Sequence, residues 1–159
     1  MALIKTILVP TDFSEPAENA VSYAVNLAEQ LGAKVVLLHA FELPVLGFPD
    51  NVVAPPADVS SRMVDAAQKA LDEAAAKVRR RSKVELSPLL WQGDPREVIL
   101  TIAENAGANL IVMGTHGRTG IARALIGSVA ENVVRESTIP VLTVHAAPTR
   151  AAAVVEGVA

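Results

Sequence analysis

Three glycines and a serine are the residues of this chain whose types and spacing best suit the binding of a ligand. They form the pattern Gly114-x2-Gly117-x9-Gly127-Ser128, which follows an apolar run at residues 110–113. Glycine has no Cβ, so it allows a ligand to approach the main chain closely. A helix that begins after such a loop offers unpaired amides and the positive end of its dipole to an anion. The spacing therefore predicts a phosphate-binding loop.

Each of these residues also has a purely structural interpretation. Gly114, Gly117 and Gly127 are compatible with a tight strand-to-helix turn, and Ser128 with Glu131 is compatible with a capping box. The two interpretations of Ser128 do not compete, because a ligand oxygen can use the amides that a cap leaves unpaired.

Charged and imidazole side chains near the glycines offer little catalytic chemistry. His116 has no carboxylate or serine nearby in the sequence to orient it as a base, so we interpret it as a loop residue. Arg118 and Arg123 could neutralise phosphate charge or simply be solvated. His39 closes an apolar segment and is expected to be a buried structural group.

Familiar nucleotide motifs are absent from the sequence. No glycine run is followed by Lys and Ser or Thr, as a P-loop requires, and a Rossmann fingerprint does not follow the first strand. No helical His-Glu pair suggests zinc, and no acidic pair beside the glycine loop suggests a magnesium site. Any metal is therefore expected to arrive bound to the nucleotide.

Composition limits the classes of function. The net charge of -3 and a pI near 5.6 argue against a nucleic-acid partner, and 3% aromatic residues provide no stacking platform. The chain has no cysteine and no apolar run near the ~20 residues that span a bilayer. We expect a cytoplasmic protein with a single domain at residues 1–146 and a tail at residues 147–159.

Apolar runs alternate with amphipathic segments along the chain. Strands are predicted at residues 6–9, 34–40, 84–91, 110–113 and 140–144. Helices are predicted at residues 16–31, 59–80, 95–106 and 128–136, the second of them entered through Asp58 or Ser60. This alternation predicts an α/β fold with a parallel sheet covered on both faces. Residues 42–57, with four of the ten prolines, form a long connection outside the pattern.

The fold class predicts where a ligand would bind. Open parallel sheets bind ligands beyond the carboxyl ends of their strands, where the strand order reverses. If the first and fourth strands are neighbours, Asp12, Ala40 and Gly114 all face one crevice. Asp12 could then accept hydrogen bonds from a ribose, or it could cap the first helix with Glu15. The main chain near Ala40 could contact an adenine edge.

Taken together, the chain resembles the universal stress proteins from residue 4 to about residue 144. The resemblance rests on residues 7–14 (ILVPTDFS), on residues 37–40 (LLHA) and above all on the segment from 111 to 144. There the spacing of the three glycines and Ser128 matches the ATP-binding branch of that family.

This resemblance implies a five-stranded parallel sheet in the order 3-2-1-4-5 with helices on both faces, a Rossmann-like fold of the adenine nucleotide alpha hydrolase-like type. It also implies homodimers, commonly paired through the last strand, and leaves open whether the dimers pair further into tetramers. By position, the adenine and ribose contacts would be Pro10, Thr11, Asp12 and Ala40. The phosphates would be surrounded by Met113, Gly114, Gly117, Gly127, Ser128 and Val129, with Arg118 beside them.

Three functions are consistent with these residues. The first is a stress-response regulator that binds ATP with little or no turnover. The second is a slow ATP hydrolase or nucleotidyl-transfer enzyme, with His116 and Arg118 stabilising phosphate charge. The third is a dimeric adaptor without nucleotide. We expect the first, because phosphoryl transfer needs a positioned metal and nucleophile.

Overall fold

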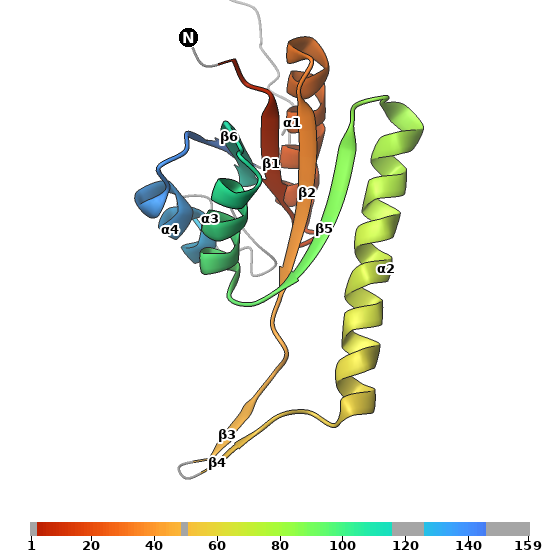
Figure 1. The fold of residues 1–159 in the computed structure, drawn as a ribbon, viewed down its shortest axis with the longest axis vertical. Coiled ribbons are helices and arrows are strands. Elements are labelled where there is room, and N and C mark those ends of the chain that lie inside the picture. The colour runs from red at the N-terminus through yellow and green to blue at the C-terminus, as the bar shows by residue number, and fades with distance from the viewer. Residues whose placement is uncertain (1–2, 49–50, 116–125, 146–159) are drawn as a thin grey trace, which may run out of the picture.

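Five parallel strands form the central sheet of the computed structural model, which describes residues 3–48, 51–115 and 126–145. The strands lie in the order β5-β2-β1-β6-β7 (Figure 1). They are β1 Thr6–Pro10, β2 Lys34–Phe41, β5 Leu86–Gln92, β6 Leu110–Gly114 and β7 Val141–Val144. Counted in chain order, these five give the predicted order 3-2-1-4-5, so the predicted fold class is confirmed.

Two helices cover each face of the sheet. Helices α1 Glu15–Leu31 and α2 Ala57–Arg81 pack on one face, and α3 Pro95–Asn105 and α4 Ser128–Glu136 pack on the other (Figure 1). Successive side chains of a strand point to opposite faces. Along β2, Val35 and Leu37 therefore join the α1–α2 core, whereas Leu38 joins the α3–α4 core. The near-continuous apolar strands are explained by this burial on both sides.

Helix α2 begins earlier than the sequence predicted. It starts at Ala57, with Pro56 as the N-cap residue and no side-chain cap, so the predicted entry through Asp58 or Ser60 is wrong. The amides of Val59 and Ser60 donate to the Pro56 carbonyl instead. A proline that lacks an amide can precede a helix without leaving a donor unsatisfied, which explains this start.

The connection between β2 and α2 contains a small hairpin that the sequence analysis missed. Strands β3 Leu46–Phe48 and β4 Asn51–Val53 pair antiparallel, with Leu46 opposite Val53. The hairpin projects beyond the end of the central sheet, at the same end of the molecule as the N-terminus of α2 (Figure 1). Within the described ranges, no helix combines the length and apolar character needed to cross a membrane.

Candidate functional site

A cavity of about 300 Å³ lies at the carboxyl ends of β1, β2 and β6. All predicted site residues within the described part of the chain line it: Pro10, Thr11, Asp12, Ala40, Met113, Gly114, Gly127, Ser128 and Val129. Gly117 and Arg118 lie outside the described residues, as do His116 and Arg123. Strands β1 and β6 are neighbours, which is the condition that brings these groups to one crevice.

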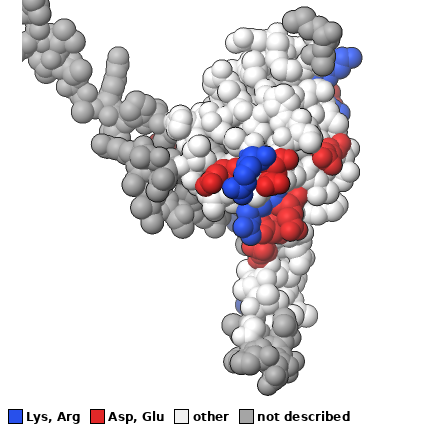
Figure 2. Space-filling model, turned by 90° about the vertical axis from the view of Figure 1, so that its left-hand side faces the viewer, with Lys and Arg blue, Asp and Glu red and all other residues white. Residues whose placement is uncertain are grey.

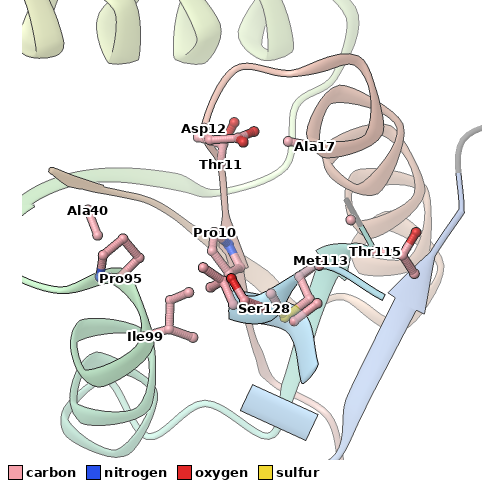
Figure 3. A pocket seen from close by; sticks show the side chains of 14 residues that line it. Pro10, Thr11, Asp12, Ala17, Ala40, Pro95, Ile99, Met113, Thr115 and Ser128 are labelled. Atoms are coloured by element: carbon pink, nitrogen blue, oxygen red, sulfur yellow. The ribbon is translucent and has the colours of Figure 1, made fainter. Parts of the chain in front are cut away.

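An apolar wall on one side of the cavity comes partly from residues that the sequence analysis did not select. Pro95 and Ile99 of α3 lie with Ala40 on one side, whereas Thr11 and Asp12 lie apart from them at the end of β1 (Figure 3). Helix α3 packs on the same face of the sheet as Ala40. Pro95 and Ile99 could have been found from the predicted strand order. That order places the start of the third helix beside the end of the second strand.

The turn after β1 presents Asp12 to the cavity. Asp12 Oδ1 accepts hydrogen bonds from the amide of Ser14, at 3.0 Å, and from the Ser14 hydroxyl. Ser14 is the N-cap residue of α1, and its Oγ accepts from the amide of Ala17 at 3.4 Å. The suggestion that Asp12 caps this helix is therefore wrong. Asp12 instead supports the capping serine, because its short carboxylate reaches the amide two residues ahead.

Phe13 has an unusual backbone conformation in the same turn. Its φ is +64°, the left-handed region, which is a genuine outlier for a bulky residue. The amide of Phe13 donates to Thr11 Oγ1 at 3.0 Å, and the amide of Thr11 donates to the Leu38 carbonyl at 2.8 Å. Such conformations persist only where the surrounding structure fixes them.

Gly114, at the end of β6, is required by packing between elements. A Cβ at this position would lie 2.9 Å from both the carbonyl carbon and the oxygen of Pro16, and 3.1 Å from the amide nitrogen of Ala17. These are backbone atoms of the first turn of α1, which cannot move aside like the end of a side chain. The absence of a side chain at Gly114 therefore allows α1 to approach the sheet.

The start of α4 differs from the predicted capping box. Gly127 is the N-cap residue, with φ of -61° and ψ of 151°, and the helix has no side-chain cap. The capping box of Ser128 and Glu131 is therefore wrong, because Ser128 is already the first helical residue. The amide of Gly127 donates to the Thr115 carbonyl, so it is engaged within the protein.

The first amides of α4 are the groups of the cavity whose chemistry best suits an anion. A helix leaves its N-terminal amides without intrahelical acceptors. Among the described residues, no backbone acceptor is found for the amides of Ser128, Val129 and Ala130. All three residues line the cavity, and the positive end of the helix dipole lies there with them. This end of the cavity suits an anion.

Thr115 connects the site to the edge strand. The residue is completely buried, its amide donates to the Val144 carbonyl at 3.1 Å, and its carbonyl accepts from Gly127. Its Oγ1 lies 3.3 Å from Nδ1 of His145, just beyond β7. Thr115 thus links the start of α4 to the end of β7.

Charged side chains lie close to the site without forming a metal centre in the described part of the chain. Within the described ranges no group of three or more His, Asp or Glu side chains could hold a metal ion. On the α3–α4 side of the molecule, basic side chains stand among acidic ones (Figure 2). Asp94, the N-cap residue of α3, accepts from the Arg96 side chain and from its amide, and these hydrogen bonds lower the pKa of Asp94.

Comparisons with known proteins agree on one family. The profile of the universal stress protein family matches residues 3–145. The universal stress protein MJ0531 of Methanocaldococcus jannaschii is 35% identical over 147 residues, which are 89% of this chain and 82% of the relative. The structure of universal stress protein UspA from Lactobacillus plantarum has a TM-score of 0.76 at 26% identity and covers 91% of this chain and 99% of its own.

A second solved structure adds a ligand. It is a universal stress protein in complex with cAMP, with a TM-score of 0.66 and 27% identity, covering 92% of this chain and 100% of its own. The family profile spans both the turn after β1 and the segment from β6 to β7. With these matches over nearly its whole length, the chain belongs to the universal stress protein family.

Proposed function

We propose that this chain binds an adenine nucleotide, in the first instance ATP, in the cavity and acts as a regulatory stress-response protein with little or no turnover. One observation carries the proposal. The first amides of α4, for which the described part of the chain shows no backbone acceptor, line the same cavity as an apolar wall from α3, and Asp12 lines it too. These are the three chemistries of a nucleotide: an anion, a flat apolar base and a sugar with hydroxyl groups.

The base would lie against the apolar wall. Pro95 and Ile99 provide a surface without polar side-chain groups, and the main chain at Ala40, which also lines the cavity, would contact the adenine edge. A cavity of about 300 Å³ is at the small end of the usual range for ligand pockets, about 300–1,000 Å³. It suits the base and sugar, with the phosphates directed towards solvent.

The sugar and phosphates would be held by the remaining groups. A carboxylate has about four acceptor sites, so Asp12 can serve both Ser14 and a ribose hydroxyl. The amides of Ser128, Val129 and Ala130 would hold phosphate oxygens. Gly117 and Arg118 stay predicted phosphate contacts, and magnesium would arrive with the nucleotide.

The cAMP complex of a structural neighbour supports this choice of ligand. That neighbour is 27% identical and is matched over its full length, and its ligand contains adenine and ribose. The cavity here offers groups for the same two parts of the molecule. Calorimetry with ADP, AMP and cAMP beside ATP would show which of the four ligands binds most tightly.

The first test needs only the purified protein. Denaturation followed by chromatography should release an adenine nucleotide, and calorimetry on the nucleotide-free protein should detect binding of ATP with magnesium. Release of phosphate or pyrophosphate, measured in parallel, should be negligible. Absence of binding at millimolar ATP would contradict the proposal, and steady product release would favour an enzyme.

Gly127→Val tests where the ligand binds. The backbone angles of Gly127 are open to any residue, so the variant should fold, but its branched side chain would enter the cavity. ATP binding should fall below detection by calorimetry. Gly47→Val is the matched control, because a Cβ at Gly47 meets nothing within 4 Å. Normal ATP affinity in Gly127→Val would show that the site is elsewhere.

A further inference from the structure

His39 is a buried residue that the proposed binding site does not use directly. It lies near the end of β2, is 8% exposed, and its Nδ1 is 2.7 Å from the main-chain oxygen of Thr11. A carbonyl oxygen only accepts hydrogen bonds, so Nδ1 must carry the proton. The expectation that His39 is buried is confirmed, and its partner is the turn that carries Asp12.

The contact comes from the face of the sheet opposite the cavity. Side chains alternate along β2, and Ala40 lines the cavity, so His39 points to the α1–α2 side together with Leu37. On that side the His39 ring packs against Phe13, with ring centroids 4.4 Å apart and planes at 44°. The imidazole therefore holds both the carbonyl before Asp12 and the side chain after it.

Besides the His39 contact, the turn has two kinds of hydrogen bond, local ones and one to strand β2. The local ones run from the amide of Phe13 to Thr11 Oγ1 and from Ser14 to Asp12. Local hydrogen bonds set the shape of a turn but not its position relative to the sheet. The Thr11 amide is bonded to the Leu38 carbonyl of β2, and His39 adds a side-chain anchor from the same strand. Phe13 at φ of +64° also needs surroundings that maintain its conformation.

We infer that His39 is a positioning residue for the nucleotide site: by fixing the Thr11 carbonyl and the Phe13 ring, it places the Asp12 carboxylate where the ribose hydroxyls bind. This inference rests on the proposed function. A general loss of stability would lower the affinity for all nucleotides alike. Loss of Asp12 positioning would lower the affinity only for nucleotides that have ribose hydroxyls.

The experiment compares ATP with 2′,3′-dideoxy-ATP by calorimetry. The unmodified protein should prefer ATP by about tenfold or more, because hydrogen bonds to a carboxylate contribute to one ligand only. His39→Leu keeps an apolar buried side chain but removes the donor. It should lower ATP affinity about tenfold, leave dideoxy-ATP affinity nearly unchanged and so abolish the preference.

Two further variants make the result specific. In His39→Asn the side-chain amide can occupy the place of Nδ1, so the preference should return. In His39→Gln the amide reaches towards Nε2 instead, so this variant should behave like His39→Leu and replaces it if His39→Leu does not fold. Val35→Ala is the control, because Val35 is buried on the same strand and the same face and lies away from the turn. It should lose stability and keep the preference.

The outcomes separate the two proposals. If the unmodified protein does not bind ATP, the proposed function fails. If it binds ATP and dideoxy-ATP equally, or if His39→Leu and His39→Gln keep the preference for ATP, the role of His39 is overturned while nucleotide binding stands.

Discussion

At the scale of single residues, Gly114 and Gly127 belong to the same sequence pattern, but different physical constraints act on them. Gly114 has no side chain because the backbone of Pro16 fills the space that a Cβ would need. Gly127 has ordinary backbone angles and lines the cavity. Packing explains the first, and ligand access is the reason we propose for the second. The sequence pattern alone gives both residues the same meaning.

Gly114→Ala should therefore destabilise the fold whether or not a ligand is present. Overpacking of this kind costs about 1–3 kcal/mol, because α1 would have to move away from β6. Urea denaturation of the nucleotide-free protein measures the loss. Gly47→Ala, where a Cβ meets nothing within 4 Å, should be close to neutral. Equal stability of the two variants would contradict the packing argument.

At the scale of elements, the helix starts decide which groups reach the cavity. Pro95 is the first residue of α3, and the cap formed by Asp94 fixes the orientation in which Pro95 and Ile99 line the wall. Helix α4 has no side-chain cap, and among the described residues its first amides have no backbone acceptor. A capped helix forms one side of the cavity, and under the proposed function the uncapped start of α4 would bind phosphate at the other.

Asp94→Ala should lower the free energy of unfolding by about 1 kcal/mol through loss of the cap, whereas Asp94→Asn should retain most of it.

The pKa of Asp94 is lowered in the folded state by the hydrogen bonds from Arg96. The stabilisation by its charge is therefore present above the unfolded-state pKa of about 4 and is lost as the pH falls through the folded-state value. Urea denaturation at neutral and acidic pH should show the difference between Asp94 and Asn shrinking in acid. A constant difference would contradict this account.

The helices and central-sheet strands predicted from the sequence all lie within two residues of their predicted bounds, whereas the hairpin of β3 and β4 was missed. The bounds of α4 were predicted correctly at residues 128–136, and β2 differs from its prediction by one residue. The hairpin was missed because three-residue strands among prolines carry too little periodicity. The caps predicted at Asp12 and Ser128 were wrong because Ser14, two residues after Asp12, and Gly127, one residue before Ser128, are the N-cap residues. Ile99 was missed because its role depends on the order of strands in space.

At the scale of the whole molecule, β7 is the edge of the sheet where the sequence predicts a homodimer. The carbonyls of Pro140 and Val144 accept from Ile111 and Thr115 of the β6 segment. Since backbone groups of a strand alternate in direction, the amides of Val141 and Thr143 point away from β6. An apolar edge of this kind is suited to pairing with a second copy.

Thr143→Pro tests that pairing. Proline removes an outward-pointing donor and leaves the hydrogen bonds to β6 in place. Light scattering should find a dimer for the unmodified protein and a monomer for the variant. Thr143→Val, which keeps the amide, should remain dimeric. A monomeric unmodified protein, or a dimeric proline variant, would show that this edge is not the dimer interface.

The close approach of α1 to Gly114 also bears on how relatives of this chain should be compared. A position whose side chain is excluded by the fold will stay glycine in descendants that have lost the ligand. Gly127 has backbone angles that any residue can adopt and lines the cavity, so under the proposed function it is expected to vary once binding ceases. Of the two, Gly127 is therefore the better marker of which lineages still recognise a nucleotide.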